Sequence, residues 1–93
     1  GAVKAACDGV KLGNITALLS KIQPAVDSVK ATIEGPYDSG NTTFVNAAIA
    51  ENVQHTIAEI RNMSPILAEL ETEGSIVIKG GVYQLASGAV EWL

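Results

Sequence analysis

The stretch that decides the fold lies at the C-terminal end, where residues 75–93 read SIVIKGGVYQLASGAVEWL. Its first four residues, 75–78, form a short β-branched run bounded by Gly74 on one side and by Gly80 and Gly81 on the other. Such a run is typical of a strand buried on both faces of a parallel sheet. Residues 82–85 continue in an extended pattern, and residues 86–89 form a turn that includes a glycine. Residues 90–93 then run back antiparallel to residues 82–85. The pattern therefore predicts a strand followed by an antiparallel hairpin.

Working back from this tail, the middle of the chain reads as helical. Residues 34–42, EGPYDSGNT, form the clearest loop, because they combine glycine, proline and short polar side chains. After this loop, apolar residues recur every three or four positions from Phe44 to Ile60, which predicts a long helix. Ser64 and Pro65 are typical of the first residues of another helix, and Gly74 is expected to end it.

The N-terminal third is also predicted to be helical. Residues 2–8 are good helix formers that stop at Gly9, and Asn14 is expected to be the N-cap of the next helix. Apolar residues then follow at helical spacing from Ile15 to Ile33. Pro24 falls inside this stripe and removes a backbone donor. The pattern predicts either a kink or two short helices joined at residues 23–24.

Together these elements predict a single α/β domain over residues 1–93, helical over residues 1–73, with a strand and a hairpin over residues 75–93. The buried-type strand needs neighbours that this chain does not offer, and an isolated two-stranded hairpin is marginal in water. We therefore expect part of a mostly parallel sheet flanked by helices, incomplete in this chain. A monomer of these residues alone is expected to fold poorly, because its strand edges lack partners.

The composition excludes several classes of protein. Apolar residues make up 47% of the chain, which excludes a disordered acidic tail. The net charge of -4 argues against a nucleic-acid binder and against attachment to an anionic membrane surface. No apolar stretch is long enough to span a bilayer, and no secretory leader opens the chain. We expect a soluble protein, and leave cytoplasm and periplasm open as its compartment.

Few residues are candidates for chemistry. Cys7 is the only cysteine, which excludes an internal disulfide, and a lone thiol in an alanine-rich helix is interpreted as a small buried hydrophobe. Glu51, His55 and Glu59 share one helix face at a spacing of four residues, the arrangement of a possible metal site. Zinc sites usually draw ligands from more than one element, so a solvated polar face is the preferred interpretation.

The remaining polar motifs complete no catalytic set. Glu69, Glu71 and Glu73 alternate around a helix end and are interpreted as a solvated surface. Lys79 precedes the glycine pair, whereas a phosphate-binding loop needs glycine, lysine and then serine or threonine. From the residues alone, the chain is an acidic α/β piece with an incomplete sheet.

Four blocks of the sequence resemble, in order, the β-class carbonic anhydrases. They are GAVKAA at residues 1–6, KLGNI at residues 11–15, ENV at residues 51–53 and GGVYQLASGAVEWL at residues 80–93. The first is similar to the segment after that family's second zinc cysteine, and the last to its closing strand and hairpin. The resemblance extends over essentially the whole chain.

The resemblance implies a C-terminal half that begins just after the second zinc-ligand cysteine. The family's Cys-x-Asp-x-Arg and His-x-x-Cys blocks are absent, so every zinc ligand would lie upstream of Gly1. In the intact family protein, zinc lowers the pKa of a bound water, and the resulting hydroxide attacks carbon dioxide to give bicarbonate. This chain alone would hold no zinc and is expected to be inactive.

Two site residues are carried over from the resemblance. Gly1 matches a glycine whose backbone N–H faces the substrate oxygens. Tyr83 matches a tyrosine that in one subgroup helps to form a regulatory bicarbonate pocket; the alternative is a core or interface aromatic. The resemblance also implies a homodimer or higher homo-oligomer, or association with the upstream half. A second hypothesis stays open, in which the chain is a non-catalytic oligomerisation or binding module that completes its sheet with a partner chain.

Overall fold

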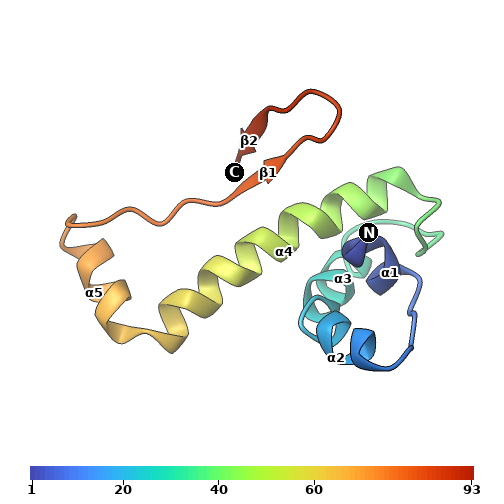
Figure 1. Cartoon of the computed structure of the whole chain (residues 1–93), viewed down its shortest axis with the longest axis horizontal. Coiled ribbons are helices and arrows are strands. Elements are labelled where there is room, and N and C mark those ends of the chain that lie inside the picture. The colour runs from blue at the N-terminus through green and yellow to red at the C-terminus, as the bar shows by residue number, and fades with distance from the viewer. The chain divides into compact units, whose positions relative to one another are not determined.

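The computed structural model describes all residues from Gly1 to Leu93. It divides them into two compact units, an N-terminal unit of residues 1–52 and a C-terminal unit of residues 53–93. Five helices come first along the chain and two short strands last (Figure 1). None of the helices has the length and the hydropathy that crossing a membrane requires.

The N-terminal unit contains three short helices and the start of a long one. They are α1 (Ala2–Cys7), α2 (Asn14–Ser20), α3 (Gln23–Lys30) and the first half of α4 (Thr42–Met63). Their apolar faces meet in one core, in which Val26 and Phe44 are completely buried. The remaining core residues are Ala6, Cys7, Leu19, Ile22, Val29, Val45 and Ala48. The helical periodicity of the sequence therefore identifies part of this core, from Leu19 to Val29, whereas Ile15 and Leu18 of the same stripe are 44% and 57% exposed.

Two short helices form in place of one kinked helix, which confirms one of the two predicted alternatives, but their junction lies at residues 21–22 and not at 23–24. The chain breaks at residues 21–22, and Pro24 lies in the first turn of α3. Proline is tolerated there because the first N–H groups of a helix have no intrahelical acceptor.

The prediction that Asn14 is an N-cap is wrong. Asn14 is the first residue of α2, and Gly13 precedes it as the cap with φ +52°. A positive φ at the boundary favours glycine. The side chain that makes a hydrogen bond at this boundary is that of Thr16, whose hydroxyl oxygen accepts from the N–H of Leu12 at 2.9 Å.

The loop predicted over residues 34–42 contains no helix or strand up to residue 41, and α4 begins at Thr42, one residue earlier than expected. It is ordered by polar contacts: Asn41 Oδ1 accepts a hydrogen bond from the N–H of Phe44 at 3.3 Å, and Asp8 Oδ1 accepts one from the N–H of Ser39 at 2.7 Å. The ring of Tyr37 packs edge-on against Phe44 with centroids 5.4 Å apart. The loop thus covers the end of the core.

The C-terminal unit consists of the second half of α4, α5 (Pro65–Thr72) and a hairpin of β1 (Gly81–Tyr83) and β2 (Val90–Trp92). The predicted helix signals are confirmed: Ser64 caps α5, with its hydroxyl accepting from the N–H of Leu67, and Gly74 follows the helix at φ +82°. The hairpin is antiparallel, with Val82 opposite Glu91, and Gly88 supplies the positive φ of its turn.

The strand predicted over residues 75–79 is wrong for this chain, and the larger parallel sheet of which it would be part is not shown. These residues form no strand, and the only sheet is the two-stranded antiparallel hairpin. A strand is defined by hydrogen bonds to a neighbour, and no segment of this chain lies beside residues 75–79 in that way. Val77, at the centre of the run, is 73% exposed instead of buried.

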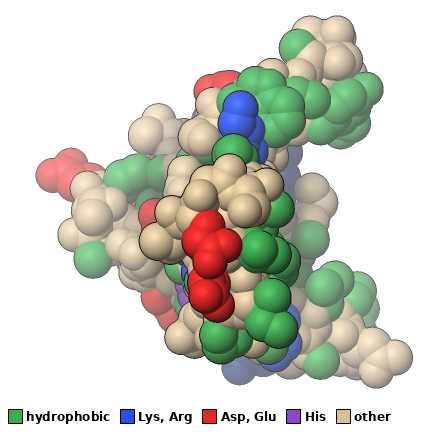
Figure 2. All heavy atoms as spheres, turned by 90° about the vertical axis from the view of Figure 1, so that its left-hand side faces the viewer, with side chains coloured by type: hydrophobic (Ala, Val, Ile, Leu, Met, Phe, Trp, Pro, Cys, Tyr) green, Lys and Arg blue, Asp and Glu red, His purple; other side chains and the backbone are tan.

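The C-terminal unit buries little of its apolar surface. Ile57 and Gly80 are its only buried residues, whereas Ile66 is 72% and Met63 77% exposed. Apolar and acidic groups lie next to one another on the surface nearest the viewer in Figure 2. A unit of this kind has apolar surface available for another chain segment.

Candidate functional site

Gly1 lies at the first position before α1, in the N-terminal unit. Its carbonyl oxygen accepts a hydrogen bond from the N–H of Ala5 at 3.0 Å, which closes the first turn of the helix. The residue is exposed, and a side chain placed on it would meet no atom within 4 Å.

Tyr83 lies at the end of β1, in the C-terminal unit, where it is paired with Val90 of β2. Its side chain is 60% exposed. No hydrogen bond or ring contact holds the phenol, whose oxygen lies 3.8 Å from where a Cβ on Gly88 would be. Tyr83 is thus not a core aromatic within its unit.

Cys7 is buried in the core of the N-terminal unit, with 4% exposure. Burial raises the pKa of its thiol, the negative charge of Asp8 raises it further, and Lys30 opposes both. A thiol with a raised pKa is a poor nucleophile at neutral pH. The structure agrees with the interpretation of Cys7 as a small apolar residue.

The residues of this chain do not fit a zinc site. Glu51, His55 and Glu59 all lie on α4, but no three histidine, cysteine or acidic side chains come together anywhere in the chain to hold a metal ion. A zinc site needs at least three protein ligands on one ion.

The one ion pair in the C-terminal unit is a contact that sequence reasoning missed. Arg61, near the end of α4, donates two hydrogen bonds to Glu71 of α5, from Nε to Oε1 at 2.7 Å and from Nη2 to Oε2 at 2.9 Å. The same carboxylate accepts a hydrogen bond from the backbone N–H of Ile78. Glu71 therefore connects α4, α5 and the extended segment after α5. Two parallel hydrogen bonds of this kind fix orientation as well as contact.

This pair makes a testable prediction about acid. The Arg61 hydrogen bonds and charge, with the Ile78 N–H, hold the pKa of Glu71 below its usual value. The pair therefore stabilises the fold above the ordinary pKa of a glutamate, and this contribution disappears as the pH falls through the lowered folded value. Arg61→Gln should raise the pKa of Glu71 part of the way back, since the Ile78 hydrogen bond remains.

The measurement is a carboxyl-carbon NMR titration of Glu71. Lys79→Gln removes the same charge from the same unit without touching the pair, and should leave the Glu71 titration unchanged. An unchanged Glu71 pKa in Arg61→Gln would show that the pair does not form.

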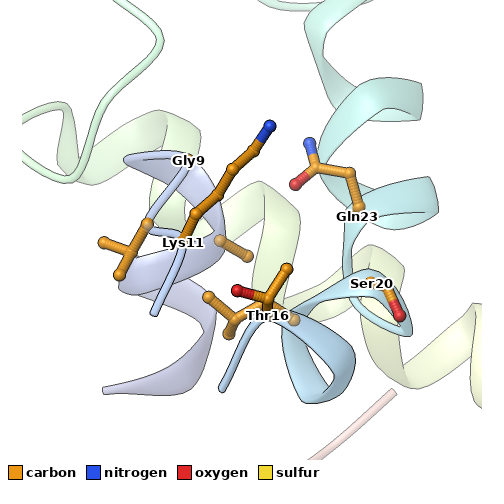
Figure 3. Close-up of a pocket in the computed structure, with 8 residues that line it drawn as sticks. Gly9, Lys11, Thr16, Ser20 and Gln23 are labelled. Carbon is orange, nitrogen blue, oxygen red and sulfur yellow. The ribbon is translucent and has the colours of Figure 1, made fainter. Parts of the chain in front are cut away.

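A surface hollow of about 230 Å³ lies in the N-terminal unit between α1, α2 and the start of α3 (Figure 3). Three apolar side chains, Ala6, Val10 and Leu19, contribute to its wall. Polar side chains of Lys11, Thr16, Ser20 and Gln23 surround it. The sequence offered no signal for this hollow, because its walls come from three separate elements.

Residues 1–90 match the model of the carbonic anhydrase family. The match extends over nearly the whole chain, so this protein belongs to the β-class carbonic anhydrase family. Comparison with curated proteins and with solved structures gave no significant match.

Proposed function

We propose that this chain is the C-terminal portion of a zinc-dependent carbonic anhydrase, which hydrates carbon dioxide reversibly to bicarbonate. The observation that carries the proposal is the family match over residues 1–90. The chain has no group of metal ligands of its own. We therefore assign the zinc ligands to a segment upstream of Gly1 and expect these residues alone to be inactive.

In this proposal the chain supplies scaffold and part of the site wall. The exposed backbone of Gly1 is assigned to the substrate side, and the half-exposed phenol of Tyr83 to a bicarbonate pocket. For Tyr83, support comes from its exposure and from the lack of a partner for its hydroxyl within its unit. Both assignments follow the family.

The proposed partners are the upstream half and further copies of the same protein. Residues 75–79 form a β-branched run without a strand neighbour, and Val77 exposes most of its surface. An upstream strand beside this run would give it a hydrogen-bonded neighbour and cover its apolar side chains. Assembly into a homodimer or higher homo-oligomer would cover more of the same unit.

The test compares the chain alone with the chain co-expressed with an upstream segment carrying the family's zinc ligands. We expect no bound zinc and no carbon dioxide hydration above the uncatalysed rate for the chain alone, and both zinc and activity for the co-expressed pair. Hydration of carbon dioxide by the isolated chain would contradict the proposal.

The exposed apolar surface of the C-terminal unit also favours a second candidate, a non-catalytic oligomerisation module. That function predicts a stable oligomer of the chain alone. The two proposals differ in light scattering of the metal-free chain: a defined oligomer supports the module, and a monomer supports the enzyme fragment.

A further inference from the structure

The hollow between α1, α2 and α3 combines an apolar wall with a cation that has no partner. Ala6 and Leu19 are buried side chains of the core, and Val10 extends the wall towards solvent with 40% exposure. Lys11 lies at the edge of the hollow. The only ion pair in the chain is that between Arg61 and Glu71, so the Lys11 ammonium group has no carboxylate at contact distance.

The other polar groups around the hollow have defined orientations. Gln23 Nε2 donates to Asp27 Oδ1 at 2.9 Å, which holds the amide in place. The hydroxyl oxygen of Thr16 accepts from the Leu12 N–H, so its own proton remains available for a ligand. Figure 3 shows the Lys11 and Gln23 side chains reaching towards the same end of the hollow.

We propose that this hollow binds small amphipathic carboxylates, with the acid group at Lys11 and the alkyl chain against Ala6, Val10 and Leu19. The shape supports a short chain: an apolar cavity of about 150 Å³ is enough for benzene. The hollow, at about 230 Å³, has room for an alkyl chain slightly larger than benzene. Charge complementarity selects an anion over a neutral molecule, because the one charged group among the lining residues is a cation.

This site is separate from the proposed carbon dioxide chemistry. It lies at the C-terminal end of α1, whereas Gly1 lies at the other end of that helix. The alkyl wall has no counterpart in carbon dioxide or bicarbonate, which carry no apolar chain. The ligand class is therefore a different one.

The test is an NMR titration of the isotope-labelled 93-residue chain with hexanoate. We expect saturable shifts confined to residues 6–23. Lys11→Gln should weaken hexanoate binding about 1.4- to fivefold, the range expected for one exposed ion pair. Hexanol, which keeps the alkyl chain and lacks the charge, should bind the unaltered chain about as weakly as hexanoate binds the variant.

Two further variants make the result specific. Lys21→Gln removes the same charge from a lysine that does not line the hollow, and should leave hexanoate binding unchanged. Val10→Asn alters the apolar wall at a half-exposed position and should weaken hexanoate and hexanol alike. The proposal is overturned by equal losses in Lys11→Gln and Lys21→Gln, by the absence of saturable shifts, or by a spectrum in which residues 1–52 are unfolded.

Discussion

Replacing Phe44 with alanine is expected to lower the free energy of unfolding of the N-terminal unit by about 3–5 kcal/mol, the usual cost of removing a buried aromatic ring. Phe44 has no exposed surface and packs against Tyr37, Val26 and their neighbours in the core. Its position at the start of α4 lets it close the end of the core formed by α1, α2 and α3. The truncated side chain would leave a cavity there.

Urea unfolding followed by helical circular dichroism measures this loss, with methyl NMR signals of Val26 and Leu19 as local reporters. Ile66→Ala is the matched control, because Ile66 is 72% exposed and its truncation should change stability by no more than about 0.5 kcal/mol. Equal effects of the two substitutions would show that the N-terminal unit has no packed core.

Gly80→Ala is expected to destabilise the C-terminal unit by about 1–3 kcal/mol, because it adds a methyl group to a site that has no room for it. A Cβ on Gly80 would overlap Val53 Cγ1 and lie 2.8 Å from Ile57 Cδ1, both on α4. The end of Ile57 can rotate away, but the branched side chain of Val53 is stiff within a helix. The start of the hairpin would then move off α4.

A second substitution tests this steric cause directly. Val53→Ala removes the overlapping methyl group, so the double variant should recover much of the loss caused by Gly80→Ala alone. Trp92 fluorescence reports on the hairpin during denaturant unfolding. A Gly80→Ala chain as stable as the original, or a double variant less stable than the sum of both single changes, would contradict the packing of Gly80 on α4.

The helices could be predicted from the sequence because their signals are local. The apolar spacing after Phe44, the cap at Ser64 and the positive φ at Gly74 each depend on residues within one or two turns. The hairpin was predictable for the same reason, since Gly88 marks its turn. The misplaced cap at Asn14 reflects a boundary that shifts by one residue when a neighbouring glycine adopts a positive φ.

The strand at residues 75–79 could not be predicted correctly from its own composition. A β-branched run shows that a segment suits a buried strand, but whether it becomes one depends on a neighbouring strand. In this chain that neighbour is missing, and Ile76 to Lys79 stay unpaired. Because this run suits a buried strand but has no neighbouring strand, it supports the proposal that an upstream segment completes the sheet.

The Arg61–Glu71 pair and the hollow beside Lys11 could not be predicted from the sequence, because both join residues from separate elements. Arg61 and Glu71 are ten residues apart across the turn at Ser64, a spacing that no helical pattern relates. The hollow beside Lys11 joins three elements. The family could be predicted from the sequence, because the resemblance compares several short blocks at once. The match over residues 1–90 confirms it.

The central claim is that these residues act as one part of a zinc enzyme whose metal ligands lie upstream. The most direct measurement is the intact mass, under denaturing conditions, of the protein that carries this sequence in its natural source. The account predicts a chain well above 9.6 kDa, the mass of the 93 residues. A single species at 9.6 kDa would contradict it and leave the oligomerisation module as the function.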